Sequence, residues 1–422
     1  MTNIINNFNK NLQTIFLCLL FYGLSISIFL KEINLILLQN FDLKIIILYR
    51  ILIIFFCIFF IFHIKKKLNL FLIIYLLIFF LFLFNSFFGQ KFIFIIDPLI
   101  FYNSINISYD AVDTFFQNKY RVIAISIFNV ILPLLIFSIN KNFKINIEKF
   151  KNTSLIICNL FLYSFSIFVF YKFLMIKFGM IKLNEAFINL HSMIYILNIH
   201  FVLLCDALKK DRDKFNLKII LSIILIFLCF FITEAILHLF ISLFGALIFL
   251  SFNKLNKKFI ILSVIIFSTI ILFIYSVISF YEIENIQKYI NFRDPGGIAN
   301  SIYVRIMNII YYLFYTDKLN ILTGNNLFIN DIFTYPHNIF IDIYICTGLI
   351  GLLIILLIFF QIIKKFKFNL NQDNIFIFII LIQSFIFSNF SGFLFTNIIF
   401  NTSLAACFCL IREKEFLITP NS

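Results

Sequence analysis

The chain has 422 residues, of which 62% are hydrophobic and only 13% are charged, and its mean hydropathy is +1.04. A water-soluble domain could not stay in solution with this composition, so soluble globular proteins are excluded. The formal net charge of +14 does not indicate a nucleic-acid partner, because the basic residues are dispersed over short connections that would face anionic lipid. Composition therefore predicts an all-α polytopic membrane protein.

Apolar runs of roughly 17 to 25 residues, the length that crosses a hydrocarbon core, recur along the chain between short polar breaks. We expect twelve transmembrane helices, at residues 12–30, 44–63, 69–87, 121–138, 153–176, 187–208, 217–233, 235–252, 259–280, 338–363, 374–390 and 393–411. No internal repeat or Pro- or Ser-rich linker separates them, so residues 1–422 are predicted to form a single polytopic membrane domain. All eight cysteines fall inside apolar runs without metal-ligand spacing, which predicts neither a disulfide framework nor a zinc site.

The distribution of charge predicts the orientation of the helices. Most of the 34 lysines and arginines lie in alternate connections such as "HIKKKLN" and "KKDRDKFNLK" and in the terminal segments. Cytoplasmic loops carry such an excess of positive charge, so both termini are expected on the cytoplasmic side. Asp211 and Asp213 form a D-x-D pair in one of these loops, but so short a loop has no room for a nucleotide-binding fold.

The longest outer connection, residues 281–337, carries a helical pattern. Apolar residues recur at helical spacing between Ile302 and Leu313, and a second stripe lies about 100 degrees around the same helix. This polar stripe consists of Ser301, Arg305, Asn308 and Tyr312. The pattern predicts a helix that lies on the membrane surface with its polar stripe facing a cleft.

The start of the predicted span 338–363 is polar. The stretch "TYPHNIFIDIYICTGLIG" places Pro336, His337, Asn338 and Asp342 at the mouth of an apolar helix. Strongly polar groups at membrane depth are expensive, so they indicate a functional site before anything else. The simpler alternative is that His337 and Asn338 only cap the helix, because asparagine is a good N-cap residue. Nothing at a helix start requires the carboxylate of Asp342, which favours a functional site.

Three features in this region carry a resemblance to a known family. Arg305 in an amphipathic loop segment, then "ILTGNN", then "PHNIFIDIYICTGLIG" resemble the signature region of the O-antigen ligase and polymerase superfamily. Its members have about a dozen spans, a large periplasmic loop between the ninth and tenth, and a His-Asn pair followed by an acidic residue and a glycine-rich turn of helix. The resemblance covers residues 220–411 in arrangement and is sharp over about 50 of them.

The resemblance implies a metal-independent membrane glycosyltransferase without a cofactor. Such an enzyme acts on undecaprenyl-pyrophosphate-linked oligosaccharides at the periplasmic face of the bacterial inner membrane. Residues 281–337 would be its large periplasmic loop. The implied partners are the lipid-linked donor, membrane lipid and other polysaccharide-assembly proteins such as a chain-length regulator, and they include no nucleic acid.

The resemblance also implies that His337, Arg305 and Asp342 are catalytic. Transfer of a glycan from a lipid pyrophosphate to a sugar hydroxyl needs a group that accepts the hydroxyl proton and cations that hold the charge growing on the pyrophosphate. A histidine titrates near neutral pH, which suits His337 to the first role, and the planar guanidinium of Arg305 suits the second. Asp342 is close enough in helical azimuth to orient the imidazole or to bind an acceptor hydroxyl.

Substrate binding is predicted for five further residues, namely Asn338, Arg50, Ser301, Asn308 and His238. Arg50 and His238 are included because this chain departs from the superfamily pattern. Ligases and many polymerases carry a Thr/Ser-Arg pair in the outer turn between the seventh and eighth spans, where this chain reads "FFITEAILHLF" with Glu234 in place of the arginine. His238 or the intramembrane Arg50 would then substitute for it, although Arg50 can equally snorkel outward.

Three functions remain open at this point. The first is a polymerase that transfers a growing polysaccharide onto the next lipid-linked repeat unit, and the second is a ligase that transfers the glycan to the lipid A core. The third is a flippase or transporter of lipid-linked sugars, with Arg50, Glu234 and Asp342 along its path. Inverted repeats and matching Gly- or Pro-broken helices are not evident in the sequence, which argues against a transporter. Glu234 in place of the arginine favours the polymerase slightly.

Overall fold

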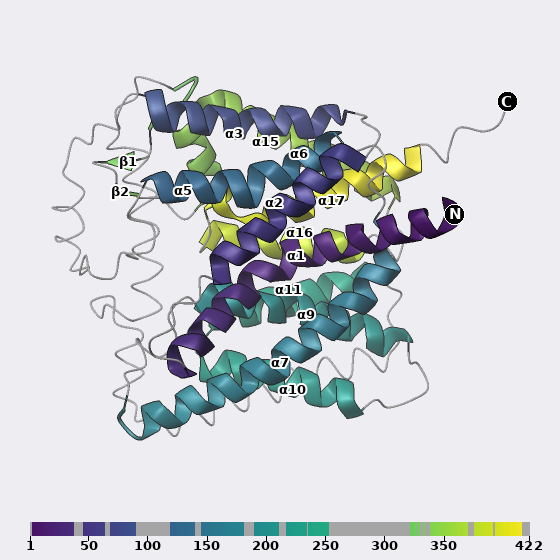
Figure 1. Cartoon of the computed structure of the whole chain (residues 1–422), viewed down its shortest axis with the longest axis vertical. Helices are drawn as coiled ribbons and strands as arrows, with labels where there is room; N and C mark the ends of the chain where they lie inside the picture. Colours follow the sequence, from purple (N-terminus) through teal and green to yellow (C-terminus); the bar gives the residue numbers. More distant parts are fainter. Residues whose placement is uncertain are drawn as a thin grey trace. The chain divides into compact units, whose positions relative to one another are not determined.

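The computed structural model describes residues 2–37, 45–63, 68–89, 119–139, 145–180, 190–210, 217–233, 235–252, 321–326, 328–329, 332–333, 338–369, 375–390 and 393–415. This part of the chain is helical apart from one pair of two-residue strands (Figure 1). The α-helices are α1 Thr2–Leu37, α2 Ile45–His63, α3 Leu70–Phe88, α5 Lys119–Ile125, α6 Leu132–Ile139, α7 Ile147–Lys177, α9 Leu190–Lys210, α10 Leu217–Ile232, α11 Ile236–Phe252, α15 Ile339–Asn369, α16 Ile375–Phe390 and α17 Ile398–Glu415.

The helices fall where the apolar runs predict them. Eleven of the twelve predicted spans coincide with an apolar helix, and the span predicted at 259–280 lies outside the described residues. In the described part of the chain, six helices are long and apolar enough to cross a membrane, namely Asn11–Asn34, Ile45–Phe62, Leu70–Phe88, Lys119–Ile139, Ile147–Lys177 and Ile339–Lys364. Shorter apolar helices lie at Ser192–Leu208, Leu217–Ile232, Leu237–Phe249, Ile375–Asn389 and Ile398–Leu410. The protein is therefore an α-helical membrane protein.

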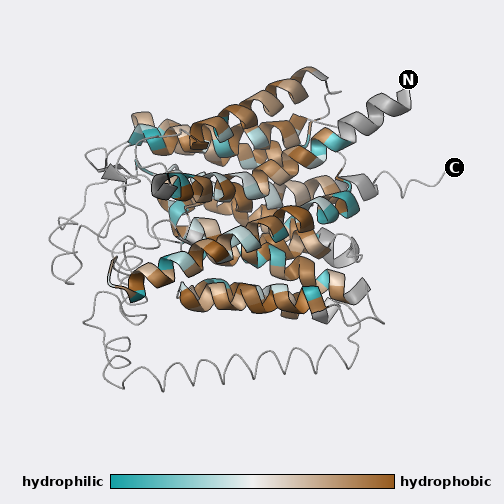
Figure 2. Cartoon of the chain, turned by 60° about the horizontal axis from the view of Figure 1, so that its bottom comes forward, coloured by the Kyte–Doolittle hydropathy of each residue, from teal (hydrophilic) through white to brown (hydrophobic). Residues whose placement is uncertain are grey.

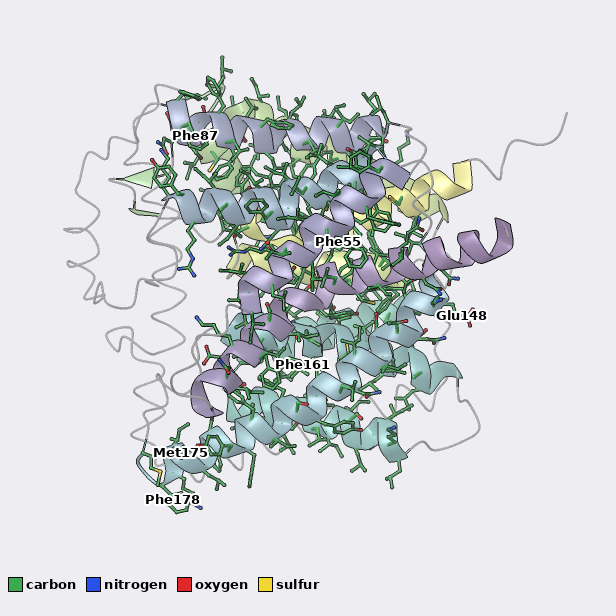
Figure 3. All side chains as sticks on the ribbon, viewed as in Figure 1. Phe55, Phe87, Glu148, Phe161, Met175 and Phe178 are labelled. Carbon is green, nitrogen blue, oxygen red and sulfur yellow. The ribbon has the colours of Figure 1, made fainter. Side chains whose placement is uncertain are left out.

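The outward faces of these helices are apolar. Figure 2 shows hydrophobic residues along the middle of the helices, with hydrophilic residues gathered mainly toward their ends. Phe55 on α2 is 63% exposed, and Phe178, which projects from the end of α7 in Figure 3, is 70% exposed. Apolar surface of this extent is unfavourable in water and favourable in lipid.

The chain folds into two compact units. The larger unit comprises residues 1–79, 124–249 and 354–422, and the smaller unit comprises residues 80–123 and 250–353. Helices α3, α5, α11 and α15 contribute residues to both. Most of residues 250–337, including most of the predicted loop 281–337, lie outside the described residues.

Helices α1 and α9 form the core of the larger unit. Helix α1 packs against α2, α7 and α9, and α9 also packs against α7, α10 and α16. Residues 193–205 of α9 are all buried. The ring of Phe29 on α1 lies 5.2 to 5.8 Å from the rings of Phe161, Phe165 and Phe168 on α7. These interlocking rings supply much of the packing between α1 and α7.

Two of the predicted spans are interrupted. The run 119–139 contains a π-helical segment, η3 Ser126–Ile131, between α5 and α6, and a 3₁₀ turn, η4 Leu394–Thr396, precedes α17. The side-chain amide of Asn401 donates to the carbonyls of Leu394 (2.8 Å) and Asn397 (2.7 Å) beside η4. Tyr75 Oη of α3 in turn donates to Asn401 Oδ1 (2.5 Å). A buried carboxamide thus satisfies backbone carbonyls near the point where regular helix stops.

A buried ion pair joins helices of the larger unit. Lys151 Nζ on α7 lies 3.0 Å from Asp206 Oδ2 on α9, and the two side chains are only 7% and 14% exposed. The same ammonium group lies 5.5 Å from the centre of the Phe376 ring on α16. The pair therefore ties three helices together through one cation.

The described part of the smaller unit is built around the end of α3 and the start of α15. The chain between these two helices includes segment 321–326 and a short hairpin of two strands, β1 Phe328–Ile329 and β2 Ile332–Phe333. The strands are antiparallel, with Phe328 opposite Phe333 and Ile329 opposite Ile332.

The burial of all eight cysteines makes a first prediction. Each cysteine is buried and free of a disulfide. A thiol must reach the reagent to react, so we expect N-ethylmaleimide to leave the protein unmodified in mild detergent and to label all eight cysteines after denaturation. Peptide mapping by mass spectrometry measures this directly. Rapid labelling of several cysteines in the native protein would contradict the observed helix arrangement.

Candidate functional site at the start of α15

Helix α15 begins with a cap in the polar stretch predicted from the sequence. The side-chain oxygen of Asn338 accepts hydrogen bonds from the backbone N–H groups of Phe340 (3.1 Å) and Ile341 (3.3 Å). The backbone N–H of Asp342 donates to the carbonyl of Asn338 (2.8 Å), which closes the first turn. The capping role considered for Asn338 is therefore real. The N–H groups of its carboxamide are the part that a substrate-binding role would use.

Asp342 lies in the first turn of α15 and has no exposed surface. Among the acidic side chains that the structure describes, it is the only one so deeply buried. The positive end of the helix dipole favours a carboxylate there, but removing a charge from water still costs several kcal/mol. Asp342 is therefore a buried polar side chain in the first turn of α15.

Helix α15 is broken at Gly348, whose φ of 65° and ψ of −162° are not helical. In a continuous helix, the N–H groups of the two residues that follow would donate to carbonyls four residues earlier. Here the N–H of Leu349 donates to the carbonyl of Ile321 (2.8 Å), and the N–H of Ile350 donates to the carbonyl of Leu322 (3.2 Å). Backbone from another segment of the chain therefore replaces two bonds of the helix.

The two carbonyls released by the break are also satisfied. The carbonyl of Ile345 accepts from the backbone N–H of Asn325 (2.7 Å). The carbonyl of Cys346 accepts from the side-chain amide of Asn85 on α3 (2.8 Å), and the same amide donates to the carbonyl of Thr323 (2.6 Å). All four backbone groups freed by the break thus have partners. An unsatisfied backbone group in an apolar environment would cost several kcal/mol.

Two glycines allow segment 321–326 to approach the break closely. Gly324 (φ 83°) and Gly348 (φ 65°) both have left-handed backbone conformations. A Cβ atom on Gly348 would collide with the backbone of Leu322, and one on Gly324 would collide with the backbone of Cys346 and Thr347. We call this arrangement, formed by segment 321–326, the break at Gly348 and the side chain of Asn85, the Gly348 junction.

Segment 321–326 lies against the break in α15. It meets α15 at Gly348, about 14 Å along the helix from Ile339 at 1.5 Å per residue, and β1 and β2 come after it in the sequence, before the cap at Asn338. The side chain of Asn326 donates to the carbonyl of Ser86 on α3 (3.4 Å), which adds a second contact to that helix. The loop is therefore held between α3 and the first part of α15.

His238, predicted to bind substrate, is a fully buried residue of α11 in the larger unit. Asn198 Nδ2 on α9 lies 2.9 Å from its Nδ1 and can donate to it. Its ring is surrounded by those of Tyr195, Phe230 and Phe387, with centroids 5.3 to 6.4 Å away. These surroundings are those of a core residue that joins α9 and α11.

Asn198 connects this histidine to two more side chains. Its Oδ1 accepts from Ser242 Oγ (2.9 Å), and its backbone carbonyl accepts from Gln383 Nε2 (3.3 Å) on α16. The same Gln383 amide donates to the carbonyl of Ile241 (3.4 Å). The network joins three helices inside an apolar core, where hydrogen-bonded polar groups specify which helices meet.

Arg50, also predicted to bind substrate, lies on α2 in the larger unit and is partly exposed. Its neighbour Tyr49 is buried, and the Tyr49 ring lies against Gly23 of α1, where a Cβ would come within 2.5 Å of it. Arg50 therefore lies on a firmly packed turn of α2. Its partial exposure is compatible with substrate binding and with snorkelling outward.

The other predicted site residues lie outside the described residues. They are His337, Arg305, Ser301 and Asn308, together with Glu234 of the turn between α10 and α11. Of the predicted site, the structure therefore places Asn338 and Asp342 one turn apart at the start of α15, and it places Arg50 and His238 in the larger unit.

Asn85 was not among the residues predicted from the sequence. The sequence feature that points to Asn85 is an Asn-Ser pair, in "FNSFF", inside the otherwise apolar run 69–87. That pair shows that one turn of α3 is polar. It does not show which backbone groups the side chains satisfy, because the partner Cys346 is 261 residues away along the chain.

Comparison with known proteins adds no relative. The chain matches no protein family, no curated protein and no solved structure. The functional interpretation therefore rests on the sequence motif and on the geometry described above.

Replacement of Asn198 by alanine should destabilise the larger unit. The change leaves the buried Ser242 hydroxyl and the His238 imidazole without their carboxamide partner, which we expect to cost about 1–3 kcal/mol per stranded group. Thermal unfolding in detergent, followed with a thiol-reactive fluorophore that detects the buried cysteines, should show a lower midpoint. Ser192→Ala on the exposed surface of the same helix should leave the midpoint unchanged. Equal midpoints for the two variants would contradict the structural role of the network.

Proposed function

We propose that the protein is a polymerase of O-antigen or another surface polysaccharide, which transfers an undecaprenyl-pyrophosphate-linked glycan to a sugar hydroxyl of the next lipid-linked repeat unit. The observation that carries the proposal is the fully buried Asp342 in the first turn of α15, directly after the "PHN" motif. Strongly polar side chains are expensive at membrane depth, so a fully buried carboxyl group there indicates a functional site. The resemblance of the surrounding sequence to the O-antigen ligase and polymerase superfamily supplies the reaction.

The proposed reaction assigns one role to each catalytic residue. The acceptor hydroxyl oxygen attacks the anomeric carbon of the donor sugar, a new glycosidic bond forms, and the bond between that carbon and the pyrophosphate oxygen breaks. The hydroxyl proton passes to His337, whose imidazole is oriented by Asp342, and the undecaprenyl pyrophosphate leaves with its negative charge held by Arg305. No metal or cofactor takes part in this scheme.

The proposed substrate site extends beyond these three residues. Asn338, Ser301 and Asn308 would donate hydrogen bonds to sugar or phosphate oxygens at the mouth of α15. Arg50 remains a candidate for the pyrophosphate because it is a permanently charged and partly exposed residue of an apolar helix. His238 would act only indirectly, because its fully buried ring already joins α9 and α11.

The proposed topology has twelve spans in the bacterial inner membrane, with both termini cytoplasmic and the 281–337 loop periplasmic. We expect alkaline phosphatase to be active when it is fused after residue 300 and inactive when it is fused after residue 212, because the enzyme folds only in the periplasm. A cytoplasmic reporter such as β-galactosidase should give the opposite pattern at the same two positions. Phosphatase activity at residue 212 would invert the orientation and place the mouth of α15 in the cytoplasm.

A ligase and a transporter are the alternatives. A ligase would use the same residues and differ only in its acceptor, the lipid A core. The break at Gly348 gives the transporter some support, because transporters use broken helices whose free backbone groups coordinate their cargo. In this protein, however, each of the four groups released by that break already has a hydrogen-bond partner. The break therefore offers less to a transported ligand than the polar mouth offers to a substrate.

The proposal predicts that His337→Ala and Asp342→Asn each abolish glycan transfer while abundance in the membrane stays normal. The first change removes the proton acceptor, and the second removes the charge that orients it. The measurement is a gel of surface polysaccharide from a deletion strain that carries each variant. Tyr344→Phe, a conservative change on the same helix, should restore the wild-type ladder. A fully active His337→Ala protein would overturn the assigned role.

The deletion strain itself distinguishes the three functions. A core that carries a single repeat unit indicates a polymerase. A bare core, with long chains accumulating on the lipid carrier, indicates a ligase. An unchanged polysaccharide pattern argues against both enzymes and favours the transporter.

A further inference from the structure

The first part of α15 is a short half-helix that runs from Ile339 to the break at Gly348. The non-helical Gly348 separates it from the longer second part and interrupts the hydrogen bonds between them. Asp342 lies on this half-helix. The contacts that hold the two ends of the half-helix therefore help to position the Asp342 carboxylate.

The two ends are held by different contacts. At the outer end, the Asn338 cap belongs to the half-helix itself and does not tie it to a neighbour. At the inner end, the carbonyls of Ile345 and Cys346 point into the Gly348 junction, where they accept from Asn325 and Asn85. Of these two donors, only Asn85 belongs to another apolar helix, α3.

The side-chain amide of Asn85 binds two segments of the chain at once. Its side-chain nitrogen donates to the carbonyl of Cys346 on the half-helix at 2.8 Å and to the carbonyl of Thr323 in segment 321–326 at 2.6 Å. The side chain is 5% exposed, and both acceptors are backbone carbonyls that cannot move without moving their segments. A planar amide with two N–H groups in fixed directions can satisfy both at once. Removing it would free the loop and the half-helix from this tie to α3 and to each other.

We propose that Asn85 is a positioning residue for the proposed glycan transfer: by closing the Gly348 junction, its carboxamide holds the half-helix that carries Asp342. Asn85 touches neither donor nor acceptor in this scheme. It acts through the backbone, and its loss misplaces the carboxylate without changing its chemistry. The inference rests on the proposed function, because the consequence for catalysis has meaning only if Asp342 takes part in transfer.

A native cysteine reports on the junction directly. Cys346 is 1% exposed, and its carbonyl is the group that Asn85 binds. In the full-length protein in mild detergent, Asn85→Ala should let N-ethylmaleimide label Cys346 at least about tenfold faster, while the other seven buried cysteines stay protected. Labelling confined to one cysteine distinguishes an opened junction from a misfolded protein.

The same variant should lose rate and not affinity. With purified protein and a lipid-linked donor, we expect kcat to fall by about 10- to 100-fold, the range expected for a catalytic group displaced by about an ångström, while KM changes little. Ser86→Ala is the matched control. It removes the next buried polar side chain of α3, whose hydroxyl donates to the carbonyl of Phe82 in its own helix (2.7 Å), and it should leave both labelling and rate unchanged.

A second variant opens the junction from the opposite side. Gly324→Ala would place a Cβ against the backbone of Cys346 and Thr347 and so displace segment 321–326 while Asn85 stays intact. It should reproduce both effects, and the double variant should be no worse than the more impaired single variant, because both changes break one unit. A fully additive loss would mean that the two residues act separately and would overturn the proposal.

The remaining outcomes are also decisive. If Cys346 becomes reactive in Asn85→Ala and transfer stays normal, the junction does not position the site. If transfer falls while Cys346 stays protected, Asn85 acts in some other way. If all eight cysteines become reactive in both variants, the junction supports the fold and not the site. A wild-type protein that transfers no glycan would instead refute the proposed function, and that result is separate because it appears before any variant is made.

Discussion

The hydrogen-bonding requirement of the backbone in an apolar environment shapes the smaller unit. A continuous α15 would satisfy all its own N–H and C=O groups, as membrane helices normally do. The break at Gly348 releases two donors and two acceptors, and it is tolerated only because each of them finds a partner. The backbone of segment 321–326 provides three of these partners, and the side chain of Asn85 provides the fourth. Segment 321–326 and the broken helix therefore require one another.

The described residues of the two units bury different kinds of polar side chain. The polar groups buried in the larger unit are mostly neutral carboxamides and hydroxyls that bridge helices, as in the network around Asn198 and in the contacts of Asn401. Its buried cation, Lys151, is paired with Asp206. Asp342 in the smaller unit is a fully buried carboxylate at the start of a helix. Hydrogen-bonded neutral groups can specify helix contacts at little cost, whereas burying a charge is more expensive.

The sequence predicted the helices well and the junction not at all. Apolar runs such as 69–87 and 217–233 determine where helices form, because in lipid a run of this length has no other way to satisfy its backbone. The cap at Asn338 and the polar character of Asp342 followed from local pattern. The break did not, because Gly348 in a glycine-containing helix reads as a close-contact position. Nor did the sequence indicate that Asn85 completes the junction, since that contact joins segments remote along the chain.

The geometry also changes the weight of the functional alternatives. A broken membrane helix first suggests a transport site, because its free backbone groups can bind an ion or a substrate. When those groups are already bound by protein, the break has another consequence: it separates a short half-helix from a long one, and contacts with segment 321–326 and Asn85 hold the inner end of the short one. The half-helix that begins at Ile339 carries Asp342 and follows the "PHN" motif. A half-helix held by its own contacts is the kind of support that the proposed catalytic site at the mouth of α15 would require.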